Sequence, residues 1–213
     1  MYDLVVFDLD GVLADAASSW VYVHNHFGTN NESSLEEYNL GIIDDHEFMR
    51  RDIALWNSAG KDVLYDDIVR VLDTVPLMPG VKQALETIMA SGMKTAIVSG
   101  GLLPLASRVA RETGIEHVLA NDLLRSPGGK LIGEGKLLVE LRNKKMPFLS
   151  VVRKTGAALE RTAAVGNSYI DAPMLQEAGL GIAFDPMDDV VVGAADVVVR
   201  EKDLRHILPF LGL

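Results

Sequence analysis

Five short apolar stretches recur along the chain, and they limit the kind of sheet that it can form. They are residues 4–7, 95–98, 163–165, 180–184 and 196–199. Continuous apolar runs of this length are typical of strands that are buried on both faces, as in a parallel sheet. We therefore expect the core of the protein to be built around such a sheet.

Helical patterns lie between these stretches. Apolar residues recur at helical spacing in residues 81–89, 105–110 and 173–178. Proline near the start of each pattern and glycine just after its end are the usual punctuation of a helix. The alternation predicts a doubly wound α/β fold with a parallel sheet. In such folds ligands bind beyond the carboxyl ends of the strands, so functional side chains are expected there.

Two regions interrupt the alternation. Residues 16–76 contain no convincing strand but include helical stretches at 47–56 and 66–72. Residues 123–141 contain Pro-Gly-Gly, which predicts the turn of a β-hairpin. The expected domains are an α/β core, formed by residues 1–15 and 77–213, and a small helical cap of residues 16–76 inserted after the first strand.

The composition excludes several classes of function. The formal net charge is −10, whereas broad binding to nucleic acid needs clustered Lys and Arg, so no nucleic-acid partner is expected. A small anionic substrate in a local positive pocket is compatible with this charge. The absence of cysteine excludes disulfides and thiolate zinc sites. Neither a signal peptide nor an apolar run of ~20 residues is visible, which predicts a cytoplasmic protein without a membrane partner.

Asp8 and Asp10 directly follow the first apolar run, so their side chains are expected to point the same way. Two carboxylates that converge on one point need a cation, a shared proton, or both. The expected cation is Mg²⁺, which prefers carboxylate oxygens, water and substrate phosphate. One carboxylate can then attack phosphorus, while the other protonates the leaving oxygen and later activates water. An isolated motif of this kind is as often an ordinary solvated turn.

Two further features carry groups that suit a phosphate ester. Residues 99–101 follow the second apolar run and are expected to open a helix. There the Ser99 hydroxyl and the main-chain N–H groups, such as that of Gly100, can bind phosphate oxygens. A serine at such a place is also a common helix cap. Lys144 and Lys145 precede a helical stretch, and a lysine there would neutralise the attacking carboxylate and the phosphoryl group. Taken singly, either lysine is more often simply solvated.

The segment GNSYID, residues 166–171, follows the third apolar run and brings Asn167 and Asp171 to the same edge. Alone it suits any loop. In this order, however, the four features together resemble the motifs of the haloacid dehalogenase superfamily of phosphohydrolases. Its first to fourth motifs are similar to DLDGVL (8–13), VSGG (98–101), Lys144 or Lys145, and GNSYID (166–171). The resemblance spans nearly the whole chain and is closest to the phosphoserine phosphatase branch, small helical cap included.

By that resemblance, Asp8 is the nucleophile that forms an aspartyl-phosphate and Asp10 is the general acid and base. Ser99 and Gly100 would hold the phosphoryl group, and the lysine at 144 or 145 would balance charge. The resemblance also implies a Mg²⁺ cofactor and a small phosphorylated metabolite as the partner.

The implied Mg²⁺ ligands are Asp8, the main-chain carbonyl of Asp10, and Asn167. Asp171 would stand behind them and orient the lysine or a metal-bound water. Asn167 departs from the family pattern, because the fourth motif usually carries Asp at that place. An amide supplies an oxygen ligand without a negative charge.

The cap departs from the branch in the residues that recognise substrate. In phosphoserine phosphatases a cap Glu meets the substrate amine and a cap Arg meets its carboxylate. The corresponding places fall near Ala17 and Asp52 here. Arg50 and Arg51 lie next to the second place and are candidates to replace the cap Arg. Phosphoserine is therefore expected to be a mediocre substrate.

Three kinds of function remain open on the sequence. The first is a Mg²⁺-dependent phosphatase of a small metabolite. The second is a phosphomutase, which uses the same carboxylate pair. The third is a catalytically weak binding or regulatory protein on the same fold, which Asn167 favours and the intact Asp8–Asp10 pair disfavours. Asp10 favours phosphoryl transfer over dehalogenation, because only a phosphoester needs a proton donor for its leaving group.

Overall fold

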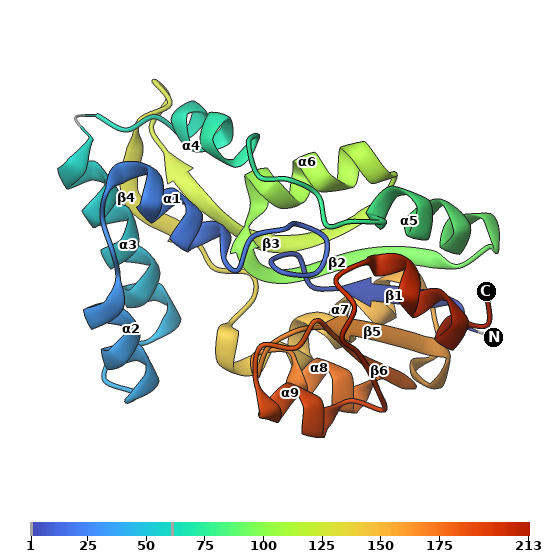
Figure 1. The fold of residues 1–213 in the computed structure, drawn as a ribbon. Helices are drawn as coiled ribbons and strands as arrows, with labels where there is room; N and C mark the ends of the chain where they lie inside the picture. The colour runs from blue at the N-terminus through green and yellow to red at the C-terminus, as the bar shows by residue number, and fades with distance from the viewer. Residues whose placement is uncertain (1, 61) are drawn as a thin grey trace.

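A seven-stranded sheet forms the centre of the molecule (Figure 1). The computed structural model describes residues 2–60 and 62–213. The strand order is β4-β3-β2-β1-β5-β6-β7. The strands are β1 (Leu4–Phe7), β2 (Lys94–Leu102), β3 (His117–Arg125), β4 (Leu131–Lys136), β5 (Thr162–Gly166), β6 (Leu180–Phe184) and β7 (Val197–Val199).

All pairings in this sheet are parallel except that of β3 with β4. The central strand β1 pairs with β2 on one side and β5 on the other. Its side chains alternate, with Val5 and Phe7 in one hydrophobic cluster and Leu4 and Val6 in a second. The predicted doubly wound parallel sheet, buried on both faces, is confirmed.

Helices cover both faces of the sheet (Figure 1). On the face of Phe7 pack α5 (Val81–Ala90), α6 (Leu103–Thr113) and the 3₁₀ segment η3 (Leu204–Leu211). On the opposite face pack α7 (Lys145–Thr155), α8 (Ala172–Glu177) and α9 (Asp189–Ala194). Two short 3₁₀ turns, η1 (Leu141–Asn143) and η2 (Leu159–Arg161), complete the connections. The N- and C-termini lie close together at one end of the sheet.

Four helices occupy the predicted insertion between β1 and α5. They are α1 (Ser19–Phe27), α2 (Glu32–Asn39), α3 (Asp45–Ala59) and α4 (Tyr65–Leu72). They gather beside the β3–β4 hairpin, where the side chain of Met49 packs on Gly135 of β4 (Figure 1). Ile53 and Trp56 are fully buried among them. The helical insertion and the hairpin are confirmed, whereas the exact limits of a cap domain at 16 and 76 stay a prediction.

The end of β2 differs from the sequence-based expectation. Residues 99–101 were expected to leave the strand and open a helix, but β2 continues to Leu102 and α6 begins at Leu103. The strand continues because β3 supplies partners at Ala120 and Asn121, with a register shift between Ser99 and Leu102. The main-chain groups near Ser99 therefore belong to a strand end rather than to a helix N-terminus.

None of the helices in the described part of the chain is both long enough and apolar enough to span a membrane.

Candidate active site

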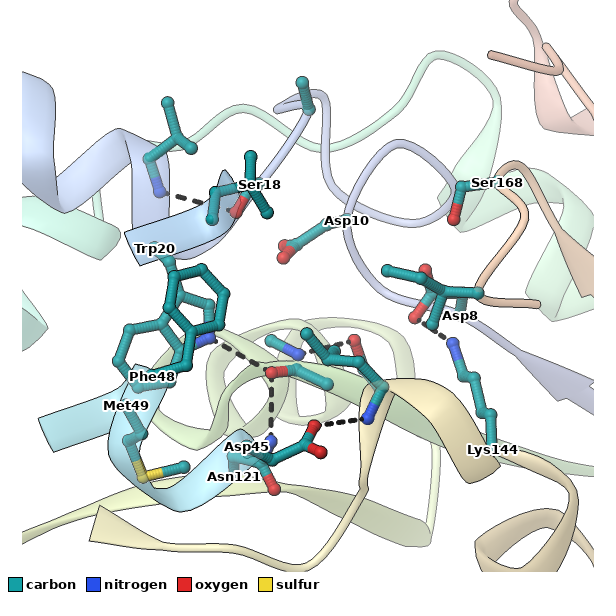
Figure 2. A pocket seen from close by; sticks show the side chains of 18 of the residues that line it. Asp8, Asp10, Ser18, Trp20, Asp45, Phe48, Met49, Asn121, Lys144 and Ser168 are labelled. Atoms are coloured by element: carbon teal, nitrogen blue, oxygen red, sulfur yellow. Dashed lines mark hydrogen bonds and ion pairs between the residues drawn. The ribbon is translucent and has the colours of Figure 1, made fainter. Parts of the chain in front are cut away.

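A cavity of about 270 Å³ lies where the carboxyl ends of the strands face the inserted helices. Figure 2 shows Asp8, Asp10 and Lys144 on the strand side of this cavity, and Trp20, Phe48 and Met49 on the helical side. Most of the motif residues singled out from the sequence line this cavity: Asp8, Asp10, Ser99, Gly100, Lys144 and Asn167. Asp171 and Lys145 are not among the lining residues.

Lys144 links two carboxylates beneath the cavity. Its Nζ lies 2.7 Å from Oδ1 of Asp8 and 2.5 Å from Oδ1 of Asp171. The lysine side chain is only 1% exposed, and that of Asp171 is fully buried. The two carboxylates raise the pKa of Lys144 against the opposing effect of burial. A buried ammonium therefore stands against Asp8, which itself faces the cavity.

Lys145 does not belong to the site, which corrects its place among the candidate phosphate-binding residues. Its side chain is 45% exposed and pairs with Glu177 of α8 at 2.6 Å. The two lysines are adjacent at the start of α7, so their side chains leave the helix about 100° apart. Only one of them can point into the site.

Asp10 is held by the first turn of α1. Its Oδ2 accepts hydrogen bonds from the main-chain N–H and the hydroxyl of Ser19, both at 2.8 Å. Burial, together with the charge of Asp8, raises the pKa of Asp10 to about 7. A side chain at Gly101 would collide with Oδ2 of Asp10, so this position requires glycine. Asp10 is thus a fixed carboxyl that carries a proton for part of the time near neutral pH.

The pKa of Asp8 is also raised by burial and by the neighbouring charge of Asp171, and the ammonium of Lys144 opposes this. The two carboxyls of the motif therefore have different surroundings. Asp8 is paired with a cation, whereas Asp10 is bound by a hydroxyl and an amide. The full positive charge beside Asp8 favours its ionised form more strongly than the neutral donors of Ser19 favour the ionised form of Asp10.

Ser99 and Gly100 form the floor of the cavity next to Asp8. The Ser99 hydroxyl accepts the N–H of Gly101 at 3.0 Å and can still donate its own proton. The carbonyl oxygen of Gly100 accepts hydrogen bonds from Trp20 Nε1 at 3.0 Å and Asn121 Nδ2 at 3.1 Å. These bonds hold the backbone at the end of β2 in one position beside the cavity.

Asn167 lies against the first motif. A Cβ on Gly11, whose φ is +75°, would come within 2.0 Å of the Asn167 amide nitrogen, so only glycine permits this approach. Asp171 holds the loop from behind, because its Oδ2 accepts the N–H groups of Asn167 at 2.8 Å and Ser168 at 3.1 Å. With its other oxygen on Lys144, both carboxylate oxygens of Asp171 are occupied.

The donor set suits a hard divalent cation. Oδ1 of Asp10 is buried and has no hydrogen-bond partner among the described residues. Within residues 2–60 and 62–213, no three His, Cys, Asp or Glu side chains converge as in a protein-only metal cage. A cation beside Asp8 would therefore complete its coordination with the Asn167 amide, a main-chain oxygen, water and phosphate. Mg²⁺ usually binds to proteins through such a mixed set of oxygen ligands.

Two polar residues of the site, Ser19 and Asn121, were not identified from the sequence. Ser19 holds Asp10 and also accepts the N–H of Leu102 at 2.9 Å. Asn121 donates to Gly100 and Val139 and accepts the N–H of Val139 at 2.8 Å, which ties β2 to the segment before η1. Both are single polar residues without a motif around them, so only the fold reveals what they contact.

A protein-family model described as haloacid dehalogenase-like hydrolase matches residues 2–179. A curated relative from Idiomarina loihiensis, named phosphoserine phosphatase, is 29% identical over 96% of this chain and 91% of its own length. Another from Lactococcus lactis subsp. lactis, with the same name, is 30% identical over 80% of this chain and 77% of its own.

Solved structures have the same fold. A phospho-aspartyl intermediate analogue of phosphoserine phosphatase superposes with a TM-score of 0.82 at 24% identity, covering 99% of both chains. The agreement extends over the inserted helices as well as the sheet, because the aligned part includes nearly the whole chain.

Proposed function

This chain belongs to the haloacid dehalogenase-like hydrolases and is a phosphatase similar to the phosphoserine phosphatases, and we propose that it hydrolyses a small phosphorylated metabolite through an aspartyl-phosphate on Asp8. The observation that carries the proposal is the different setting of the two carboxyls: Asp8 pairs with the buried ammonium of Lys144, whereas Asp10 is held by the main-chain N–H and the hydroxyl of Ser19. Two carboxyls whose surroundings separate their protonation states fit the roles of nucleophile and acid.

In the first half of the proposed reaction, an oxygen of Asp8 attacks phosphorus and the bond to the leaving alcohol breaks. Asp10 gives its proton to the alcohol oxygen as this bond breaks. The Ser99 hydroxyl and the N–H of Gly100 donate to the phosphoryl oxygens. The buried ammonium of Lys144 offsets negative charge on the acyl phosphate.

In the second half, the now ionised Asp10 removes a proton from water, which attacks phosphorus and breaks its bond to Asp8. Inorganic phosphate leaves, and both carboxyls return to their starting states. The alcohol leaves and water attacks on the same side of phosphorus, opposite Asp8, so one acid–base group can serve both steps.

Asp8, the main-chain carbonyl of Asp10 and the amide oxygen of Asn167 are the proposed ligands of Mg²⁺. When bound, the ion would neutralise phosphate charge and orient the phosphoryl group toward Asp8. Both carboxylate oxygens of Asp171 already bond to Lys144 and to the loop N–H groups, which supports a place for Asp171 behind the metal ligands.

The test is release of inorganic phosphate from 4-nitrophenyl phosphate, with Mg²⁺ and after its removal by EDTA. We expect Mg²⁺-dependent release in the wild type and none above background with Asp8→Asn, because a neutral amide cannot form the acyl phosphate. Asp10→Asn is expected to lower the rate of phosphate release on the order of 10²–10⁴-fold. Activity retained by Asp8→Asn, or label from substrate found in a rearranged product instead of free phosphate, would refute the proposal.

A further inference from the structure

The helical side of the cavity has a composition of its own. Trp20, Phe48 and Met49 lie together on that side, opposite Asp8 and Lys144 (Figure 2). Besides Ser18, the polar side chains that the inserted region adds to the lining are those of Asn31, Asp45 and Asp52. Among the described lining residues Lys144 is the single cationic side chain, and it is already paired with two carboxylates.

Asp52 is the polar residue whose bonding is incomplete. It lines the cavity from α3 and is only 2% exposed. Its Oδ2 accepts a hydrogen bond from Asn31 Nδ2 at 3.1 Å. Its Oδ1 lies 3.3 Å from Nε2 of His24, but neither atom has a well-aligned hydrogen-bond partner within the described residues. Oδ1 of Asp52 therefore meets only the poorly aligned Nε2 of His24 among the described residues, and it keeps a lone pair for a donor in the cavity.

His24 presents its Nε2 to Asp52. Trp56 Nε1 lies 3.1 Å from Nδ1 of His24, and an indole nitrogen can only donate. Nδ1 is therefore an accepting nitrogen, and the hydroxyl of Thr29 also contacts it, at 2.7 Å. Among the described residues, the side chains of His24 and Asn31 contact the Asp52 carboxyl, and no lysine or arginine pairs with it.

The nearest arginines on α3 are used elsewhere. Arg50 pairs with Glu47 at 2.9 Å and Glu134 at 3.0 Å, and Arg51 pairs with Glu37 at 2.8 Å as well as with Glu47. Neither arginine is among the lining residues. The suggestion from the sequence that one of them meets a substrate carboxylate is therefore not supported by these contacts.

We propose that the substrate is the phosphate ester of an amino alcohol without a carboxylate, and that Asp52 binds its ammonium group beside the aromatic wall. The proposal rests on the proposed phosphatase function, because it concerns the alcohol part of the same ester. An ammonium supplies donors to the free oxygen of Asp52, and aromatic rings such as Trp20 and Phe48 also favour a cation.

A substrate carboxylate would meet the opposite situation. It would enter a cavity with Asp45 and Asp52 in its wall and would find no unpaired cation there among the described residues. Like charges repel strongly where water is excluded. Burial raises the pKa of Asp52, and a bound ammonium would favour the ionised carboxylate. The charges of the cavity thus distinguish an ester that carries only the ammonium from one that carries a carboxylate as well.

Three small esters test the proposal. O-phosphoethanolamine carries the ammonium alone, O-phospho-L-serine adds a carboxylate, and 2-hydroxyethyl phosphate replaces the ammonium by a neutral hydroxyl. We measure kcat/KM for phosphate release from each, with 4-nitrophenyl phosphate as the reference for a working enzyme. The wild type is expected to prefer O-phosphoethanolamine over each of the other two by at least about tenfold, the size of one charge-assisted contact.

A matched pair of variants assigns the preference to Asp52. Asp52→Asn keeps the shape and removes the charge, and it is expected to reduce the preference for O-phosphoethanolamine over 2-hydroxyethyl phosphate about tenfold. Asp66→Asn makes the same change at an exposed carboxylate of α4 outside the cavity, and it is expected to leave this ratio unchanged. Circular dichroism verifies that each variant is folded.

The outcomes separate the two proposals. Failure to release phosphate from any ester, 4-nitrophenyl phosphate included, refutes the phosphatase function and the inference with it. Hydrolysis of 4-nitrophenyl phosphate without the expected preference, above all a preference for O-phospho-L-serine, overturns the inference alone. The wild-type comparison decides this even when Asp52→Asn does not fold. An unchanged ratio in a folded Asp52→Asn also overturns it.

Discussion

Two adjacent lysines show how much of this site depends on single side chains. Lys144→Met is expected to lose at least ~10²-fold in kcat, because the ammonium that faces Asp8 disappears. Lys145→Met is the matched control, since that side chain is exposed and pairs with Glu177. Its kcat is expected to stay within about twofold of the wild type, as for most surface substitutions. Equal losses in the two variants would show that the lysines act through the start of α7 rather than through Asp8.

The proposed role of Asn167 leads to a prediction about the affinity for Mg²⁺. If its amide oxygen binds Mg²⁺, Asn167→Asp adds a negative charge and lowers the Mg²⁺ concentration needed for half-maximal activity. The same charge faces the phosphate, so KM is expected to rise. A Mg²⁺ titration at fixed substrate, with wild type, Asn167→Asp and Asp171→Asn, measures both. An unchanged midpoint in Asn167→Asp with a large shift in Asp171→Asn would make Asp171 the ligand.

The sequence identified most of the residues that line the strand side of the site, because they stand in short motifs directly after buried strands. It did not distinguish Lys144 from Lys145, because which of two adjacent side chains enters the site depends on where α7 starts relative to the sheet. It also missed Ser19 and Asn121, whose partners Asp10 and Gly100 are distant in sequence. Residues that act through long-range contacts leave no local pattern.

At the scale of elements, α3 contributes to the cavity, because it carries Phe48, Met49 and Asp52. The stability of this helix therefore also matters for the cavity. Its N-cap is Asp44, which accepts the N–H of Glu47 at 2.8 Å. Asp44→Ala is expected to cost about 1 kcal/mol of unfolding free energy, the usual value of such a cap. The midpoint temperature of thermal unfolding should then fall by roughly 2–4 °C in a chain of this size.

His46→Ala is the control for this change, because His46 is exposed in the same first turn and makes no cap. Its midpoint should stay within about 1 °C of the wild type, as surface substitutions change stability by at most ~0.5 kcal/mol. A loss in His46→Ala as large as that in Asp44→Ala would show that the effect is not specific to the cap.

The elements themselves were largely predictable. The extent of β6 and the Pro-Gly-Gly turn between β3 and β4 agree with the sequence pattern. The length of β2 was underestimated, because glycine is depleted in strands and the pairing with β3 that retains Gly100 and Gly101 is not visible locally. Tertiary pairing here overrides the preference of the residues.

At the scale of the whole molecule, one hydrophobic cluster runs through the sheet and the inserted helices. It contains Phe7 of β1 and Leu85 of α5 together with Ile53, Trp56 and Ile68 of the insertion. The insertion is therefore not stabilised by a core of its own. We expect the chain to unfold in a single cooperative transition.

Urea unfolding tests this expectation. The two tryptophans, Trp20 and Trp56, both lie in the inserted helices, so their fluorescence reports on that part alone. Far-UV circular dichroism reports on all helices and strands. Coincident midpoints are expected for a two-state transition. A fluorescence change that precedes the circular dichroism change would show that the insertion unfolds as a separate domain.

The central place of β1 has a consequence for how the protein is made. Leu4 pairs with Thr162, and 162 − 4 gives a separation of 158 residues. At the usual ~5–20 residues per second of synthesis, β1 is made roughly 8–32 s before its second neighbour, β5. During that interval Asp8 and Asp10 lack Asn167, and for most of it they also lack Lys144. A nascent chain that ends before β5 should therefore be catalytically silent.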